Sequence, residues 1–488
     1  MQGGCYKPLS DRDLQQIHSL VLQLLAELGL SQAPPSLAER AVAAGCELSS
    51  DGRLRFPHTL VEDTLARTRR ELTLHGIDPA HDIAIGKRRV HTGTGGAAPT
   101  IMDFESGRYR ESTVADLYDI TRLVDRMEHI HWYHRSVVAR DAPSTLALDI
   151  NTTYACLQGT TKSIAVSYTD GDSVRAALPM LDRVAGGENR FRQRPFCTAV
   201  CCHVVPPMRF ATESCEALEA AVEAGMPILL VAAGQAGATS PAALAGAVAQ
   251  TCAEVLAGLI LCNIIDPNCR AIFAAWPFVS DLRTGAMSGG SGEQALLAAA
   301  CAQMAVFYDL PSSVPAGMTD SKLPDTQCGG EKGYTISLAA HAGASMIHEC
   351  AGMQGSLMGT SFESYVLDND LLGAILRTVR GIEVNQDTLN FDVIRDTVLG
   401  EGHYLGHAQT LARMKSDYLY PQIADRRSIG EWEESGSRDA RELARERVSE
   451  ILAAHYPGHV SAHTDAWIRQ QYEIILPRSR MLAGNGAW

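Results

Sequence analysis

The sequence predicts a TIM (β/α)8 barrel, an α/β fold, with an N-terminal helical cap before it and a C-terminal helical region after it. Short apolar runs rich in β-branched residues alternate with amphipathic stretches of helix length from residue 90 onward, as in successive strand–helix units. Eight such runs occur, which is the strand number of a TIM barrel. A doubly wound open sheet is the alternative, but the glycines of residues 93–96 lack the full phosphate-binding spacing that often follows its first strand.

Residues 1–85 are expected to form an all-helical cap. Apolar residues recur at helical spacing over residues 11–28, and two further helices are expected over residues 36–44 and 57–69. One face of the first helix would carry Leu14, Ile17, Val21, Leu24 and Leu28.

Residues 86–362 are expected to form the catalytic barrel. A hairpin over residues 101–109, turning at residues 105–107, would follow the first strand. Residues 363–488 are expected to be a helical region packed on the barrel, with dense charge at helical spacing over residues 426–456. The eight strands are expected over residues 89–92, 130–138, 163–166, 196–203, 227–231, 271–275, 312–316 and 345–348.

Composition narrows the function classes. The formal net charge of −14, without a stripe of Lys and Arg interleaved with aromatic residues, disfavours a nucleic-acid partner. Thirteen cysteines, an odd number scattered through apolar segments, indicate reduced thiols rather than a disulfide framework. We expect no apolar run of the roughly 20 residues that span a membrane and see no signal peptide, so a cytoplasmic protein is expected.

A polar loop after the seventh expected strand is the most informative segment. The carboxyl ends of barrel strands open onto the ligand-binding crevice, so loops there carry reacting groups. We expect this loop to form the active-site floor, with Asp320 and Glu331 in a catalytic role and Lys322 and Tyr334 in contact with the substrate. The alternative for Glu331 is a residue in the first turn of a helix, where the helix dipole favours a carboxylate.

Residues at or just after the other strand ends should face the same mouth. Aromatic faces combined with carboxylates suit a quaternary ammonium ion, which is held by cation–π contacts of about 0.5–2 kcal/mol each. The alternative for each aromatic residue is packing at the barrel top. For Glu349, the third catalytic candidate, it is an ion pair with an Arg of an outer helix. The remaining expected substrate contacts are Tyr168, His203, Gln235, Trp276, Phe278 and His348.

No metal site is expected. Cys201, Cys202 and His203 are consecutive, but adjacent cysteines on a strand point to opposite faces and cannot both bind one ion. Neither a C-x-x-C nor an H-E-x-x-H motif is present. A buried strand explains this segment better.

Four segments together resemble a known protein family. They are residues 317–349, which contain the polar loop, and residues 381–389, 402–410 and 425–432. They resemble the trimethylamine methyltransferase (MttB) family, and the resemblance extends from about residue 90 nearly to the end of the chain. It implies an enzyme that moves a methyl group from a methylated amine to the cobalt of a separate corrinoid protein.

The resemblance also bears on the methyl donor. Members with pyrrolysine act on trimethylamine, and members without it are associated with quaternary amines. This chain has only ordinary residues, with Leu323 at or beside the pyrrolysine position. We therefore expect glycine betaine as donor, with proline betaine, carnitine, γ-butyrobetaine and trimethylamine as alternatives. Arg135, Lys322 and the backbone N–H groups of residues 93–96 are candidate anchors for a substrate carboxylate.

The corrinoid (cobalamin) is expected to be presented by a cognate partner protein and not bound tightly, because the chain has no D-x-H-x-x-G motif. A bulky macrocycle needs close approach, so Gly289, Gly290 and Gly292 are expected to face it. We also expect a homo-oligomer. Two alternatives of other classes are a non-catalytic betaine-binding barrel and a metal-dependent lyase or aldolase, the latter with Lys322 as a Schiff-base residue.

Overall fold

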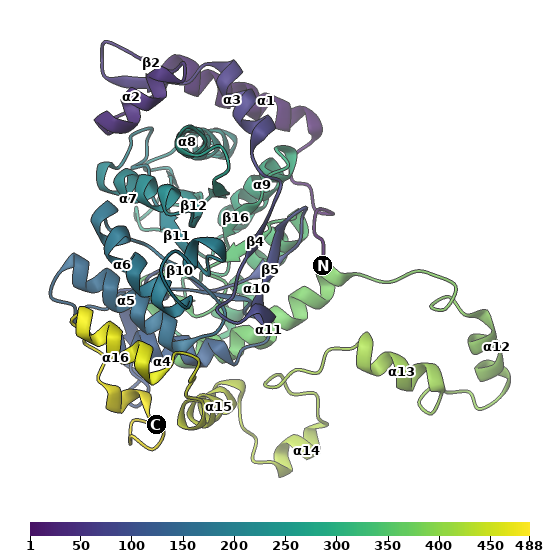
Figure 1. Cartoon of the computed structure of the whole chain (residues 1–488). Coiled ribbons are helices and arrows are strands. Elements are labelled where there is room, and N and C mark those ends of the chain that lie inside the picture. Colours follow the sequence, from purple (N-terminus) through teal and green to yellow (C-terminus); the bar gives the residue numbers. More distant parts are fainter.

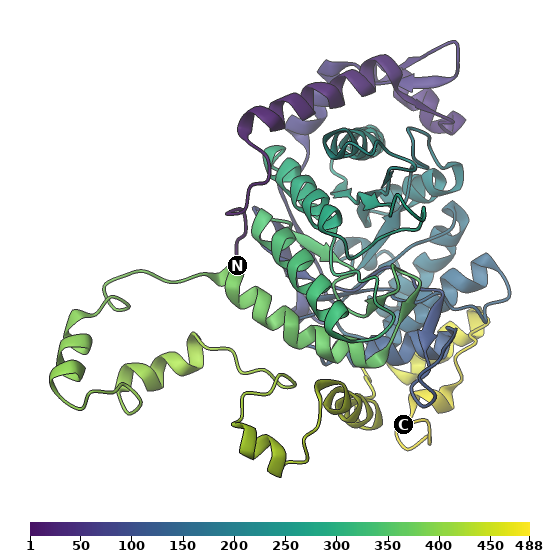
Figure 2. The ribbon, with the colours of Figure 1, turned by 180° about the vertical axis from the view of Figure 1, so that it is seen from behind.

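The computed structural model describes all 488 residues and contains the expected (β/α)8 barrel (Figures 1 and 2). The eight strands are parallel and follow one another around the barrel, which closes where β17 pairs with β6 and Gly93 pairs with Trp132. Each strand overlaps one predicted range, so the fold prediction is confirmed. The strands are β6 (His91–Thr92), β9 (Trp132–His134), β10 (Ser163–Val166), β11 (Cys197–Cys201), β12 (Pro227–Ala232), β14 (Arg270–Ala275), β16 (Ser312–Pro315) and β17 (Met346–His348).

One long helix follows each strand and covers the outside of the barrel (Figure 1). Several begin at residues suited to cap a helix: the side chains of Thr113, Asp170, Ser291 and Asp325 each accept a hydrogen bond from a first-turn N–H group. The helices are α4 (Val114–Asp125), α5 (Thr145–Gly159), α6 (Gly171–Val184), α7 (Thr212–Glu223), α8 (Leu244–Ile265), α9 (Gly292–Phe307), α10 (Thr326–Ala342) and α11 (Phe362–Arg380).

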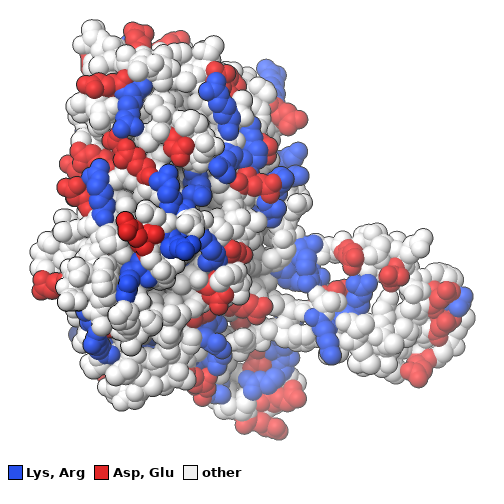
Figure 3. Space-filling view, viewed as in Figure 1, with Lys and Arg blue, Asp and Glu red and all other residues white.

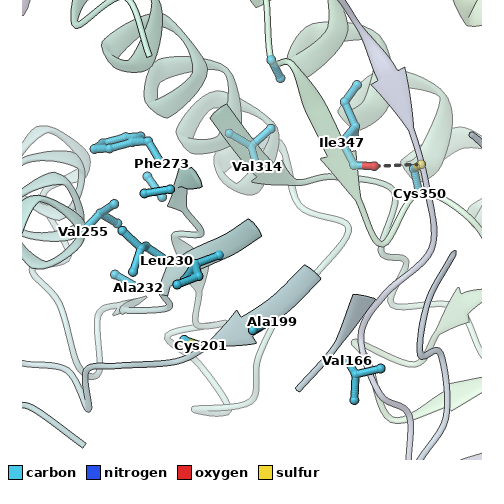
Figure 4. Close-up of a cluster of buried hydrophobic side chains, with 14 of the residues drawn as sticks. Val166, Ala199, Cys201, Leu230, Ala232, Val255, Phe273, Val314, Ile347 and Cys350 are labelled. Carbon is cyan, nitrogen blue, oxygen red and sulfur yellow. Dashed lines mark hydrogen bonds between the residues drawn. The ribbon is translucent and has the colours of Figure 1, made fainter. Parts of the chain in front are cut away.

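The strand residues divide between two cores. Outward-facing residues belong to the large core beneath the helices, and Figure 4 shows Val166, Cys201 and Leu230 there together with Val255 of α8. Inward-facing residues fill the lower lumen of the barrel in a separate cluster that includes Trp132, Ala165, Val200, Leu229, Ile272 and Met346. Because side chains alternate along a strand, residues two positions beyond these point into the upper lumen.

The N-terminal region is not all helical, contrary to expectation. Helices α1 (Asp11–Gln23), α2 (Pro35–Ala43) and α3 (His58–Arg67) are present, but β4 (Glu71–Leu74) pairs antiparallel with β5 (Ile83–Gly86). Leu72, Leu74 and Ile85 of this hairpin join the inner core, so the hairpin plugs the amino-terminal end of the barrel. Residues 71–74 alternate between exposed and buried, a strand period that a search for helical spacing misses. The smaller elements are η1 (Leu24–Leu28), β1 (Leu30–Ser31), β2 (Glu47–Leu48), β3 (Arg53–Arg55), η2 (Pro79–His81) and η3 (Phe191–Gln193).

Helix α8 corrects the expectation about apolar length. By length and composition alone, this 22-residue helix could cross a membrane, and the sequence analysis did not anticipate it. Most of it is buried inside the protein, against β12, β14 and α1. A helix that is apolar on all sides is also what a buried core position requires.

Short strands surround the carboxyl end of the barrel. The predicted hairpin is confirmed as β7 (Thr100–Met102) and β8 (Tyr109–Glu111), and β18 (Met353–Gln354) and β19 (Gly359–Thr360) extend it to a four-stranded sheet. Across the mouth, β13 (Gln235–Ala236) pairs with β15 (Phe278–Val279).

The C-terminal region packs on the barrel only in part. Helix α15 (Ala440–Ala454) lies against α11 and α4, and α16 (Ala462–Gln471) against α6. Residues 381–438 instead project from the barrel as an arm (Figures 1 and 2), so the expectation was wrong for them. Figure 3 shows basic and acidic residues interspersed over barrel and arm, with no stripe of one sign on that face. The arm contains α12 (Phe391–Leu399), α13 (Ala408–Ser416) and α14 (Ile429–Glu434), and η4 (Arg478–Met481) follows α16.

Candidate active site at the carboxyl end of the barrel

The upper lumen is lined by polar and aromatic side chains from successive strands. His134, Ser167 and Cys202 lie two positions beyond the inward-facing Trp132, Ala165 and Val200, and Trp276 belongs to the inner cluster itself. Sequence reasoning did not name Trp132, Ser167, Ser313 or Cys202 as site residues. The alternation of inward and outward residues was the signal that would have identified them.

His348 lies at the centre of this group. Its ring centroid is 5.0 Å from those of Trp132 and Trp276 and 5.6 Å from that of His134. Trp276 Nε1–H donates to Ser313 Oγ over 3.0 Å, and Ser313 Oγ lies 2.7 Å from His348 Nδ1. Ser313 has no other acceptor, so its hydroxyl donates to Nδ1, and the ring proton sits on the unpartnered Nε2.

Both histidines are neutral. Burial holds the pKa of His348 well below its ordinary value. Burial, helped by the nearby Arg135 guanidinium, lowers the pKa of His134 to about 3. The two rings therefore present uncharged faces to the lumen at physiological pH.

Glu349 follows β17 and is the buried carboxyl group of the site. It is 1% exposed, neither of its oxygens has a hydrogen-bond partner within the protein, and its φ is 64°, in the left-handed region. Burial raises the pKa of Glu349 to about 8, so the group is mostly protonated at pH 7. A strained backbone under an unpaired buried carboxyl is typical of a ligand site and does not fit the alternative of an ion pair with an outer-helix Arg.

Arg135, directly after β9, is an unpaired cation at this end of the barrel. Its guanidinium makes no hydrogen bond with the protein, and its Nε is buried. Burial lowers the pKa of Arg135, and Asp149 opposes that effect without approaching to ion-pair distance. Cys202 is exposed, yet burial raises the pKa of its thiol, which Arg135 lowers and Glu349 raises further. Cys202 therefore lies in a recess of the lumen, close enough to Arg135 and to Glu349 to respond to the charge of each.

The polar loop holds the rim of the barrel together. Glu331 accepts hydrogen bonds from Thr319 Oγ1 at 2.5 Å and from Asp320 N at 2.7 Å. Asp320 in turn accepts from Ser288 Oγ and Gly289 N, each at 2.7 Å. Glu331 lies in the second turn of α10, so the first-turn alternative does not apply. Both carboxylates are placed to position neighbouring loops.

Other predicted site residues lie away from the lumen. Tyr168 faces α5, with its hydroxyl 3.3 Å from Thr153 Oγ1, and His203 faces α8, with Nε2 2.9 Å from Glu254 O. These partners lie on the surrounding helices, so both side chains point outward. Lys322 is exposed, and its Nζ donates to Asp320 O at 2.6 Å.

The remaining predicted residues lie on the rim. Gln235 donates to Ser280 Oγ at 2.8 Å, and half-buried Phe278 packs against the inner cluster. Tyr334 donates to Gly290 O. Gly289 and Gly290 are buried beneath Met318 and Glu331, whereas Gly292 is exposed with open space around it. No group of three or more His, Cys, Asp or Glu residues is placed to hold a metal ion.

Comparison with known proteins places this geometry in a family. The family model described as trimethylamine methyltransferase (MTTB) matches residues 2–473. Trimethylamine methyltransferase MttB2 of Methanosarcina mazei is 30% identical over 456 residues, covering 92% of this chain and 91% of that protein. Glycine betaine methyltransferase of Desulfitobacterium hafniense is 27% identical over 462 residues, covering 94% and 95%. The crystal structure of the monomethylamine methyltransferase MtmB of Methanosarcina barkeri shares the fold, with a TM-score of 0.50 at 12% identity over 92% of this chain and 96% of that one.

Proposed function

Because the chain belongs to the trimethylamine methyltransferase (MTTB) family and is a methyltransferase, we propose that it demethylates a quaternary amine bearing a carboxylate, with glycine betaine as the first candidate. The methyl acceptor in this proposal is a corrinoid presented by a separate protein. The main support for the proposal is the unpaired side chain of Arg135. Its guanidinium has no partner within the protein, and its charge reaches the thiol of Cys202 in the recess.

The two charges of a betaine match two features at this end of the barrel. An unpaired guanidinium suits a carboxylate, which it can bind through two parallel charge-assisted hydrogen bonds. The faces of Trp132 and Trp276, next to the neutral imidazole of His348, suit a quaternary ammonium ion. Lys322 is tied to the backbone on the rim, so Arg135 is the anchor favoured among the candidates.

Demethylation of a quaternary amine requires little proton transfer by the protein. A quaternary nitrogen leaves as a neutral tertiary amine when it loses a methyl group, so no general acid is needed, in agreement with two neutral histidines. Corrinoid cobalt supplies the nucleophile when it is presented at the mouth. The residues of this chain orient the substrate so that its methyl group faces the mouth.

The rim fits a group presented from outside. The recess is open, since Cys202 is exposed at its wall. Gly289 and Gly290 are buried and cannot touch a macrocycle directly, so the expected contact edge reduces to Gly292. Leu282, Leu323 and Met358 are exposed on neighbouring loops and would extend that edge with apolar surface.

Sequence identity alone does not choose the donor, because relatives named for trimethylamine and for glycine betaine are about equally similar to this chain. Trimethylamine would leave Arg135 unpaired. Proline betaine, carnitine and γ-butyrobetaine share the carboxylate and differ in its distance from the nitrogen, so they remain alternatives.

The test is a donor panel assayed with Arg135→Gln. Enzyme, a Co(I) corrinoid and each donor are incubated, and the demethylated amine is quantified by mass spectrometry. For the wild type we expect activity on a betaine. For Arg135→Gln we expect KM for that betaine to rise about 10- to 100-fold, since a charge-assisted contact contributes about 1.5–3 kcal/mol.

The control variant is Lys322→Ala, which removes a rim cation and should leave KM unchanged. Tetramethylammonium, which lacks the carboxylate, should bind wild type and Arg135→Gln equally. Demethylation of trimethylamine in preference to every betaine would contradict the proposal.

A further inference from the structure

The arm of residues 381–438 is a structured part of the chain without a core of its own. Within it only Thr397 and Ile423 are buried. Helices α12 and α13 have nine residues each, and no other helix or strand packs extensively against either one. Isolated helices of fewer than about 12 residues are marginal in water, so the arm requires contacts that the single chain does not supply.

The arm is nevertheless held in a defined position. Its return segment is fixed at α11, where the Asp370 carboxylate accepts hydrogen bonds from the N–H groups of Gln422, Ile423 and Ala424 at 2.7–3.0 Å. Arg377 of α11 donates to Asp417 O at 2.6 Å. Asn390 and His407 cap the two helices. These contacts indicate a preformed surface and not a linker.

That surface is strongly apolar. Fourteen of the twenty-eight exposed large hydrophobic side chains of the protein belong to the arm. On α12, Phe391, Ile394 and Val398 recur at i, i+3 and i+7, which aligns them along one exposed face. Leu405, between the helices, is 82% exposed.

The exposed apolar area of the arm indicates which kind of partner covers it. Four of the fourteen side chains are aromatic, with about 150–250 Å² each, and ten are aliphatic, with about 60–120 Å² each. Since most are more than half exposed, together they present on the order of 1,000 Å². Two such faces in contact would remove about 2,000 Å² from water, at the lower end of the 2,000–5,000 Å² of obligate homodimer interfaces. A corrinoid protein that leaves after each methyl transfer would expose this face repeatedly.

We infer that the arm is the interface between copies of this chain, with the apolar faces of two arms covering one another. The arm projects away from its own barrel (Figures 1 and 2), so its apolar face is available to a second molecule. A groove of about 810 Å³ lies between the arm and α11, where the arm leaves the barrel. Arg377, Tyr404, Arg413 and Tyr418 line it and add polar groups to this surface. The inference extends the expectation of a homo-oligomer to a named surface and does not depend on the methyl donor.

The experiment measures the mass of the full chain by light scattering after size exclusion at about 10 µM. We expect at least twice the monomer mass of 52.5 kDa for the wild type. Substitution of Phe391→Asp, Leu405→Asp and Leu411→Asp together should weaken self-association at least 100-fold and give the monomer mass, since buried interface side chains each contribute strongly. The control Leu282→Asp changes an equally exposed leucine on the barrel rim and should keep the wild-type mass.

Circular dichroism of the triple variant checks that the barrel remains folded. Hydrogen exchange on the wild type gives a second test that needs no variant: amides of α12 and α13 should be protected at 10 µM and exchange at least tenfold faster on dilution. A monomeric wild type, or a triple variant that keeps the wild-type mass, overturns the inference. Protection of these helices that appears only when a corrinoid protein is added also overturns it, and assigns the arm to that partner.

Discussion

Replacement of Glu349 by Gln tests the protonation state of this buried carboxyl group. The pKa of Glu349 is raised from an ordinary 4.5 to about 8 by burial, so the folded protein holds a proton that the unfolded chain releases above pH 4.5. Each pH unit is worth about 1.36 kcal/mol, so keeping this carboxyl protonated costs the fold about 3 kcal/mol at pH 7. Glutamine has nearly the same shape and carries no such cost.

The sign of the effect follows from proton binding. Between pH 4.5 and 8 the folded state binds more protons at Glu349 than the unfolded state, so stability falls as pH rises through this window. Glu349→Gln should therefore match the wild type near pH 4.5 and exceed it by about 3 kcal/mol at pH 7. With an unfolding entropy of about 2.1 cal/mol/K per residue over a chain of this length, Tm rises by about 3 °C.

Ligand binding should reverse the protonation. A quaternary ammonium beside Glu349 favours the carboxylate, so binding of glycine betaine at pH 7 should release nearly one proton, and almost none at pH 9, where Glu349 is already ionised. Calorimetry in buffers of different ionisation enthalpy measures this number. Glu349→Gln should release no proton and should bind at least tenfold more weakly.

Glu254→Gln is the matched control, because Glu254 is also buried, with a pKa raised to about 7, but lies on α8 outside the lumen. It should gain stability with pH in the same direction and leave ligand-linked proton release unchanged. The reasoning about Glu349 fails if its Gln variant is stabilised equally at pH 5 and pH 8.5, or if wild type and variant release the same number of protons.

Two further predictions concern other buried groups. Cys5 and Cys202 are the exposed cysteines among thirteen, so iodoacetamide at pH 9 should label two thiols of the native protein. Glycine betaine should protect Cys202 but not Cys5. Labelling of Cys202 at the same rate with and without a betaine would show that Cys202 is not part of the site. Lys332 Nζ contacts Asp368 Oδ2 at 2.5 Å in the core, so Lys332→Met should lower the free energy of unfolding in urea by about 3–5 kcal/mol, whereas Lys332→Met with Asp368→Asn should recover much of the loss; equal stability of single and double variants would show that the unpaired Asp368 charge is not the cause.

The barrel strands were predictable because each combines a short apolar run with a helix-length connection, and these signals depend on local sequence. The β4–β5 hairpin was missed because its alternation lasts only four residues, within a region where helical spacing had already been assigned. The arm was missed for another reason. Its helices have ordinary caps and spacing, and nothing local shows that the chain leaves the barrel at residue 381 and returns near residue 440.

The strand ends that carry the site were predictable from the sequence, but the direction in which each side chain points was not. Tyr168 and His203 follow Ser167 and Cys202 directly, and a shift of one residue along a strand reverses the direction of a side chain. The inward position of Trp132, Ala165 and Val200 shows which side chains of these strands point into the lumen. That position can be assigned only once the register of neighbouring strands is known. Glu331 and Asp320 make contacts that join loops, and the unpaired Glu349 and Arg135 carry the features of a ligand site.

Under the proposed function, the charge state of the lumen favours a zwitterion over a simple amine. The histidines are neutral and Glu349 is mostly protonated, so Arg135 has no counter-charge at ion-pair distance. A substrate carboxylate supplies that counter-charge, and the quaternary nitrogen allows Glu349 to ionise beside it. Trimethylamine supplies neither a carboxylate nor, in its unprotonated form, a cation. The recess would then keep both its unpaired guanidinium and its protonated carboxyl, and binding energy available to align the methyl group would be lost.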